Sequence, residues 1–154
     1  MTSSNAIESF LKSKDFLGCY PLDRLPPFPK KLPKSMIINT HTSNKTGEHW
    51  LALVLTKQKC LYFDSFGWSI IEGNILRYLK PYYKTITYSD MCIQDSLSDK
   101  CGEFCIAFIQ NVKNVPSYNR FLSKFDSNYL KNNDKIVLSL LKKNTFIIKQ
   151  MCFF

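Results

Sequence analysis

The sequence predicts an α+β fold in which a mainly antiparallel sheet packs against one central helix. Three strand-like runs lie close together at 35–40, 49–56 and 59–66, and a tight turn joins the last two. An almost wholly apolar helical run follows at 101–111. A chain of 154 residues buries about 68–70% of its unfolded surface, and no linker or low-complexity stretch divides it. We therefore expect a single domain over residues 1–154.

The segments before the predicted hairpin form a short helix, a rigid connection and a strand. A capping box at Asn5–Glu8 starts a helix that buries Ile7, Phe10 and Leu11 and ends near Gly18. Residues 20–33 hold five of the seven prolines, so we expect an extended connection that could form one wall of a peptide groove. The strand at 35–40 follows it.

The segments after the hairpin alternate between helix and strand. A second capping box at Ser69 starts a helix that Pro81 stops, and a short strand follows at 85–88. Apolar spacing predicts that a further helix starts at 121–125 and that a last one covers 136–141.

Composition and charge narrow the classes of function. Six cysteines without a secretory signal predict reduced thiols and an intracellular protein that is not secreted. Two histidines and no paired Cys-x-x-Cys units argue against a structural zinc site, and no apolar run is long enough to span a membrane. We expect a monomer. The net charge of +9 is typical of a protein that binds DNA or another polyanion, or of a solvated lysine-rich surface, and both interpretations stay open.

A candidate nucleophile stands where a polar run meets the apolar helix. Cys101 heads that helix, where the dipole and the unpaired first-turn N–H groups favour thiolate, the nucleophilic form. Gly102 keeps the backbone beside the sulfur open. Gln94, just upstream, offers an amide N–H group to an oxyanion, although an ordinary loop glutamine is the alternative. Cys105 is expected to be a small core residue.

A cysteine nucleophile needs a base and a group that orients the base. Of the two histidines, His49 begins a strand beside Trp50, whereas His41 lies in a polar loop and is expected to be solvated. Asp64 ends the next strand, so a hairpin brings it beside His49, where it can hold the imidazole. The alternatives are a structural histidine and a turn-forming aspartate. Trp50 either shields the pair from water or belongs to the core.

The same residues carry a resemblance to a known family. His49–Trp50, Tyr62–Gly67, Gln94 and Cys101–Cys105 occur in the order found in the adenain family, the adenovirus-type maturation cysteine proteases, including relatives from Polinton and adintovirus-like viruses. The likeness covers roughly residues 4–112 and becomes faint beyond them.

This resemblance implies a fold and an activity. The fold would be the papain-like type that proteases for ubiquitin-like modifiers share. The activity would be that of a cysteine endopeptidase that processes virion precursor proteins, in the host cell nucleus or in the virion. The family's nucleophile falls on Cys101, its histidine on His49, its oxyanion glutamine on Gln94 and its acid on Asp64. Adenain has a glutamate at the position of Asp64.

The resemblance also bears on regulation. No cofactor or metal is expected for the chemistry, but stimulation by DNA and by a disulfide-linked activating peptide is implied. The cysteine that receives this peptide falls near Tyr83, where no cysteine is in register. Two other functions remain as alternatives: a deubiquitinase or isopeptidase for ubiquitin-like modifiers, and a non-catalytic DNA-binding virion protein.

Overall fold

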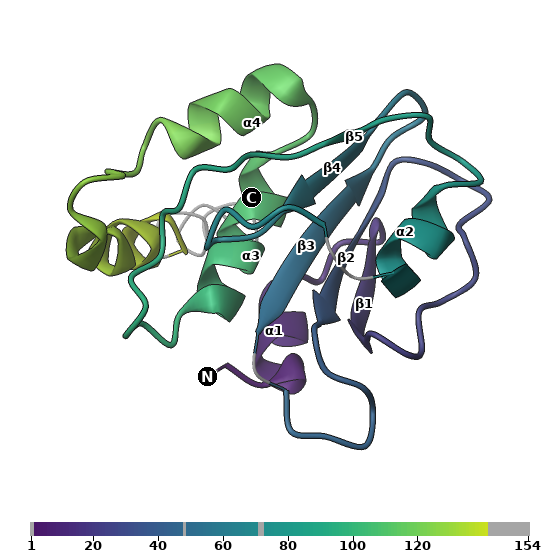
Figure 1. Cartoon of the computed structure of the whole chain (residues 1–154), viewed down its shortest axis with the longest axis horizontal. Helices are drawn as coiled ribbons and strands as arrows, with labels where there is room; N and C mark the ends of the chain where they lie inside the picture. The colour runs from purple at the N-terminus through teal and green to yellow at the C-terminus, as the bar shows by residue number, and fades with distance from the viewer. Residues whose placement is uncertain (1, 48, 71–72, 142–154) are drawn as a thin grey trace, which may run out of the picture.

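A five-stranded sheet lies at the centre of the computed structural model, which describes residues 2–47, 49–70 and 73–141 (Figure 1). The strands occupy the sheet in their order along the chain, and they are β1 (Phe16–Pro21), β2 (Lys34–Asn39), β3 (Trp50–Leu55), β4 (Cys60–Phe63) and β5 (Ile86–Thr87). The central strands β2, β3 and β4 are antiparallel, as predicted. The edge strands β1 and β5 each join in parallel, so the complete sheet is mixed.

The predicted hairpin is confirmed as β3 and β4. All residues of both strands are buried, because β3 reads as a continuous apolar run and β4 nearly so. The turn closes with the Thr56 N–H donating to the Lys59 carbonyl at 2.9 Å. Ala52 pairs with Phe63 at the other end of the ladder. A strand buried on both faces needs cover on both sides of the sheet.

Helices supply that cover (Figure 1). Helices α3 (Cys101–Asn111) and α4 (Val115–Leu122) lie on one side, and α2 (Gly73–Leu79) lies on the other. Side chains alternate along β3, so Ala52 and Val54 belong to the cluster with α3, while Leu53 belongs to the cluster with α2. The α+β architecture with one central helix is therefore confirmed. Within the described residues, no helix is both long and apolar enough to cross a bilayer.

Helix α3 is buried nearly all round, as its apolar sequence predicts. Phe104 and Phe108 are fully buried, and Phe108 stacks on Phe63 of β4 with ring centroids 4.5 Å apart. The Tyr118 hydroxyl of α4 donates to the Tyr62 carbonyl at 2.7 Å. These contacts fix the position of α3 against the sheet.

The start of the chain differs from the prediction in two details. Helix α1 (Ser4–Phe10) is capped by Ser3, not by Asn5, and Phe10 is 43% exposed, so it is not part of the buried face. Gly18 does not end the helix but lies within β1, at a φ of +131° that side chains rarely adopt.

The predicted start of a helix at 121–125 is wrong. Helix α4 begins at Val115 and ends at Leu122, because Asn114 and Ser117 form a reciprocal capping box ahead of the apolar positions. The other predictions for this half are confirmed where the structure describes them: α2 falls between Ser69 and Pro81, β5 falls within 85–88, and residues 133–141 are helical. Residues 71–72 of the predicted second helix lie outside the described residues.

Candidate active site

His49 and Asp64 meet at the open end of the hairpin. His49 directly precedes β3 and Asp64 directly follows β4, so the antiparallel register sets them side by side. The His49 Nε2 atom lies 2.9 Å from Asp64 Oδ1, and the two residues are only 8% and 5% exposed. The predicted pairing of base and acid is thus present as a buried contact.

The turn after β4 holds the Asp64 carboxylate in place. Its Oδ1 atom also accepts the Phe66 backbone N–H at 2.8 Å, and its carbonyl accepts the Gly67 N–H at 3.0 Å. Gly67 has a φ of +72°, and a Cβ atom there would lie 2.5 Å from the Asp90 carbonyl oxygen. Only glycine suits this position.

Cys101 is the first residue of α3 and is 3% exposed. Its thiol lies near enough to the His49 ring to raise the pKa of that ring. Because Nε2 of His49 faces Asp64, Nδ1 is the ring nitrogen left for the sulfur. The N-cap residue Lys100 makes no side-chain cap bond, so the first-turn N–H groups favour negative charge at Cys101.

The surroundings of His49 stabilise its charged form. Burial by itself lowers the pKa of the ring, but the hydrogen bond to Asp64 and the interactions with the Asp64 carboxylate and the Cys101 thiol outweigh burial. Together they raise the pKa of His49 from 6.5 to about 9. The arrangement therefore favours the imidazolium form of His49, next to the candidate nucleophile.

Two aromatic rings from the turn after β4 cover the His49 ring. The ring centroid of Phe66 lies 4.8 Å from that of His49, and the centroid of Trp68 lies 6.2 Å away. Trp68 is nevertheless 60% exposed, so it borders the solvent. This cover was not predicted from the sequence. The available signal was the aromatic pair that follows Asp64 within four residues.

Gln94 lies in the loop that leads into α3 and is 2% exposed. Its Nε2 donates to the Ser98 carbonyl at 2.9 Å, and its Oε1 accepts the Ser65 hydroxyl at 2.5 Å. Gln94 is therefore held in place inside the protein, and its role in binding an oxyanion stays a prediction. Ser65, which holds the amide, was not identified from the sequence, although it directly follows Asp64.

The other cysteines have different surroundings. Cys105 is fully buried, donates its Sγ–H to the Trp50 carbonyl at 3.3 Å, and has a pKa raised well above its usual value by burial, so it is a core residue as predicted. Burial and the nearby Glu8 raise the pKa of Cys19 to about 12. Cys152 lies outside the described residues. No cluster of three or more His, Cys, Asp or Glu side chains in the described part of the chain could hold a metal ion.

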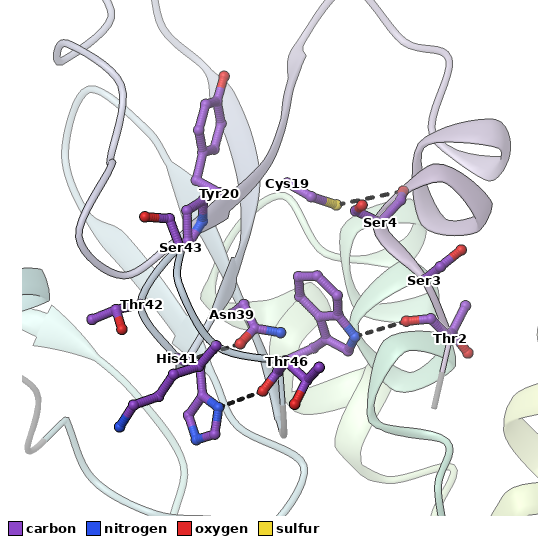
Figure 2. Close-up of a pocket in the computed structure, with 14 residues that line it drawn as sticks. Thr2, Ser3, Ser4, Cys19, Tyr20, Asn39, His41, Thr42, Ser43 and Thr46 are labelled. Atoms are coloured by element: carbon purple, nitrogen blue, oxygen red, sulfur yellow. Dashed lines mark hydrogen bonds between the residues drawn. The ribbon is translucent and has the colours of Figure 1, made fainter.

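A pocket of about 590 Å³ lies beside this centre, between residues 2–4 and the loop 41–47 (Figure 2). Trp50 lines it, is 6% exposed and donates its Nε1–H to the Thr2 carbonyl at 3.0 Å. Thr2 lies against Gly102, because a Cβ atom on Gly102 would be 3.0 Å from the Thr2 Cβ. The pocket wall therefore adjoins the residue next to Cys101. Trp50 belongs to the core cluster and also anchors this wall.

The remaining walls of the pocket come from β1, β2 and the loop. Tyr20 and Pro21 line it, and they begin the proline-rich stretch that was expected to border a groove. His41 is half-buried in the loop, with Nδ1 against the Thr46 carbonyl, so it is less solvated than predicted. A Cβ atom on Gly47 would overlap the side-chain amide of Asn39, so a larger residue there would displace that amide.

Comparison with known proteins identifies the family. A protease of Snake adenovirus serotype 1 is 29% identical over 133 residues, which are 72% of this chain and 63% of that protein. The chain thus spans less than two thirds of this relative's length. A crystal structure of the selenomethionine form of the ASFV protease aligns with a TM-score of 0.40 and 22% identity, over 64% of this chain and 43% of that one.

The family match extends further along the chain than the sequence likeness suggested. The adenovirus endoprotease family matches residues 16–133, past residue 112, where the likeness was expected to become faint. Because the matched segment is well over half of the sequence, the chain belongs to the adenovirus endoprotease family.

Proposed function

We propose that this protein is a viral cysteine endopeptidase that processes virion precursor proteins, with Cys101 as its nucleophile. One observation carries the proposal: the buried His49 ring is hydrogen-bonded to Asp64, and the Cys101 thiol at the start of α3 lies near enough to raise the pKa of the same ring. Family membership supports the same reaction class. A nucleophile, a base and a group that orients the base are the parts that acyl transfer through a thioester needs.

In the proposed mechanism the Cys101 thiolate attacks the scissile carbonyl, while His49 carries the proton. The His49 imidazolium gives that proton to the leaving amine as the C–N bond breaks, which leaves a thioester. A water molecule then attacks the thioester while His49 takes its proton. The C–S bond breaks, which releases the acid product and restores the thiolate and the imidazolium. Asp64 keeps Nε2 of the ring occupied, so that Nδ1 faces the sulfur throughout.

The negative oxygen that forms during each attack needs donors. We assign this role to the side-chain amide of Gln94 and to the backbone N–H of Cys101. The burial of Gln94 and its place in the loop that enters α3 support the assignment. Fixed donors in a site that excludes water are worth more than the same donors in solution.

We assign the pocket beside Trp50 to the substrate peptide. Its wall at Thr2 touches Gly102, the residue next to Cys101, which supports this assignment. Hydroxyl and amide side chains from the loop 41–47 and from Asn39 line it, which suits the backbone of an extended peptide.

We further propose that the protein acts as a monomer in the host nucleus or the virion, and that DNA stimulates it. The net charge of +9 supports attraction to DNA. An activating peptide would have to work without a disulfide at Tyr83. That side chain is only 8% exposed, and its hydroxyl donates to the Thr56 carbonyl at 2.8 Å.

A cleavage panel tests the function. The purified chain is incubated with candidate capsid precursors and with ubiquitin-like fusions, each with and without DNA. We expect selective cleavage of the precursors that disappears in Cys101→Ala and persists in Cys60→Ala, which removes a buried thiol on the other side of the sheet.

Two outcomes would favour the alternatives. Selective cleavage of the fusions would indicate an isopeptidase for ubiquitin-like modifiers. Salt-sensitive DNA binding that is the same in Cys101→Ala, with no hydrolysis of any substrate by the wild type, would indicate a non-catalytic DNA-binding protein.

A further inference from the structure

The buried contact between Ser65 and Gln94 has no role in the mechanism described so far. Ser65 is 0% exposed, and its Oγ–H donates to Gln94 Oε1 at 2.5 Å. Gln94 is itself 2% exposed. A buried serine and a buried glutamine are uncommon in a core, and their contact fixes the plane of the amide.

The partners of Gln94 also determine which way its amide points. The Ser98 carbonyl can only accept a hydrogen bond, so the amide atom 2.9 Å from it must be Nε2. The oxygen Oε1 then faces Ser65, which must donate. An amide nitrogen carries two hydrogens, and the Ser98 carbonyl takes one of them. The second hydrogen is left for the oxyanion role that the proposed function assigns to Gln94.

The backbone around Gln94 is held by other groups. The Ser65 carbonyl accepts the N–H groups of Ile93 and Gln94 at 2.9 and 3.0 Å. The Asn133 side chain donates to the Ile93 carbonyl at 2.9 Å. Replacing Ser65 by alanine keeps all three bonds, because two of them use its backbone carbonyl and the third does not involve Ser65. The hydroxyl of Ser65 therefore acts on the Gln94 side chain alone.

We propose that Ser65 is a positioning residue, whose hydroxyl holds the Gln94 amide so that its second N–H points at the oxyanion. This inference rests on the proposed function. Asp64 and Ser65 are neighbours in the chain, and one orients the base while the next orients the oxyanion donor. A single turn after β4 thus sets both parts of the reaction centre.

Nuclear magnetic resonance tests the contact without reference to activity. The Gln94 side-chain amide is assigned in ¹⁵N-labelled protein from the signal lost in Gln94→Glu. In the wild type we expect a pair of shifted amide signals that exchange slowly with water. In Ser65→Ala we expect them to move toward the usual glutamine position and to exchange faster. Ser117→Ala, which removes another buried serine hydroxyl at the start of α4, should leave them unchanged.

Kinetics test what the contact does. In Ser65→Ala we expect kcat to fall by about tenfold, less than the loss of a whole oxyanion donor, with little change in KM. Alkylation of Cys101 by iodoacetamide forms no oxyanion, so its rate should stay near that of the wild type. Adding Ser65→Ala to Gln94→Ala should cause no further loss, because the two changes act through one group.

The outcomes separate the two claims. Gln94 amide signals in Ser65→Ala that match the wild type, or equal losses in kcat and in alkylation rate, would overturn the positioning role. If the signals respond as expected but the wild type hydrolyses no substrate, the proposed function fails while the Ser65 contact stands.

Discussion

The two sides of the sheet each bury a cysteine, and the two thiols have opposite surroundings. On the α3 side, Cys101 is 3% exposed and lies near enough to His49 to raise the pKa of the imidazole. On the α2 side, Cys60 is 0% exposed, and burial among apolar groups raises its pKa to about 12. Both thiols are almost completely buried. The chemistry of a cysteine in this fold therefore depends on its partners and not on its exposure.

Helix α3 contains the same contrast within a single turn. Cys105 follows Cys101 by four residues and is also buried, but its thiol donates to a carbonyl and its pKa is raised. The difference is that Cys101 stands at the helix N-terminus, opposite the end of the hairpin that carries His49 and Asp64. One helix thus carries a nucleophile candidate and a core residue.

The largest expected effect separates the two sides of the sheet directly. Cys101→Ala and His49→Ala should each lower kcat/KM by at least about a thousandfold, because members of a catalytic triad act as a unit. Cys60→Ala should keep most of the activity. Steady-state hydrolysis of a peptide substrate measures all three variants. Equal activities would remove the distinction between the two sides.

The next effect concerns the carboxylate. Asp64→Asn removes a charge and changes an acceptor that together raise the pKa of His49, so this pKa should fall. The imidazolium would then be lost at a lower pH, and the alkaline limb of kcat/KM, expected near pH 9 in the wild type, should move down. We expect a drop of about 10²-fold in kcat/KM at neutral pH, at the low end of acid–base contributions. An unchanged limb would mean that Asp64 does not act on His49.

The same pKa predicts the pH dependence of stability. The folded pKa of His49, about 9, exceeds its ordinary value of 6.5. Its contribution to stability is therefore complete below about pH 6.5 and is lost as the pH rises through 9. Urea unfolding across this range measures the free energy of unfolding. As the pH rises, this free energy should decrease less in His49→Gln than in the wild type. A decrease of equal size would contradict the assignment.

A smaller effect on catalysis is expected on the other side of the sheet. Leu79 of α2 is fully buried against the sheet, so Leu79→Ala should lower the free energy of unfolding by about 2–5 kcal/mol. Because α2 carries none of the reacting groups, the pH dependence of kcat/KM should be the same in the protein that remains folded. Denaturant unfolding and this pH dependence are measured on the same sample. A shift in the pH dependence of kcat/KM would show that packing on the α2 side affects the groups on the α3 side.

The smallest effect tests the aromatic cover. Trp68 is 60% exposed, so Trp68→Ala should hardly change stability. Its ring lies within reach of the His49 ring and should favour the charged imidazolium slightly. The alkaline limb should then move down by about half a pH unit or less, as expected for a partly exposed cation–π contact. Trp68→Phe serves as the control, and its alkaline limb should lie close to the pH found for the wild type.

The α3 side of the molecule was the more predictable one. Cys101 stands at an abrupt change from polar to apolar sequence, and His49 and Asp64 stand at the ends of two adjacent strands. Each of these positions follows from local sequence and from the geometry of a hairpin. The contact of His49 with Asp64 confirms that reasoning, whereas the catalytic roles remain predictions.

What the sequence did not reveal depends on contacts between distant segments or on caps. The hydroxyl of Ser65 finds its hydrogen-bond partner only when the loop that carries Gln94, 29 residues further along the chain, folds against it. The cap at Asn114 moved the start of α4 ahead of its apolar positions. The parallel edge strand β1 was not predicted at all, because six half-buried residues interrupted by Gly18 have no clear alternation.

Labelling with a peptide-based thiol electrophile, followed by mass-spectrometric mapping, tests most directly whether Cys101 is activated by its partners. We predict an adduct on Cys101 that forms well before any adduct on Cys19 or Cys92, and that nearly disappears in His49→Ala. Adducts that spread over several cysteines at similar rates, or a Cys101 rate that His49→Ala leaves unchanged, would contradict the account.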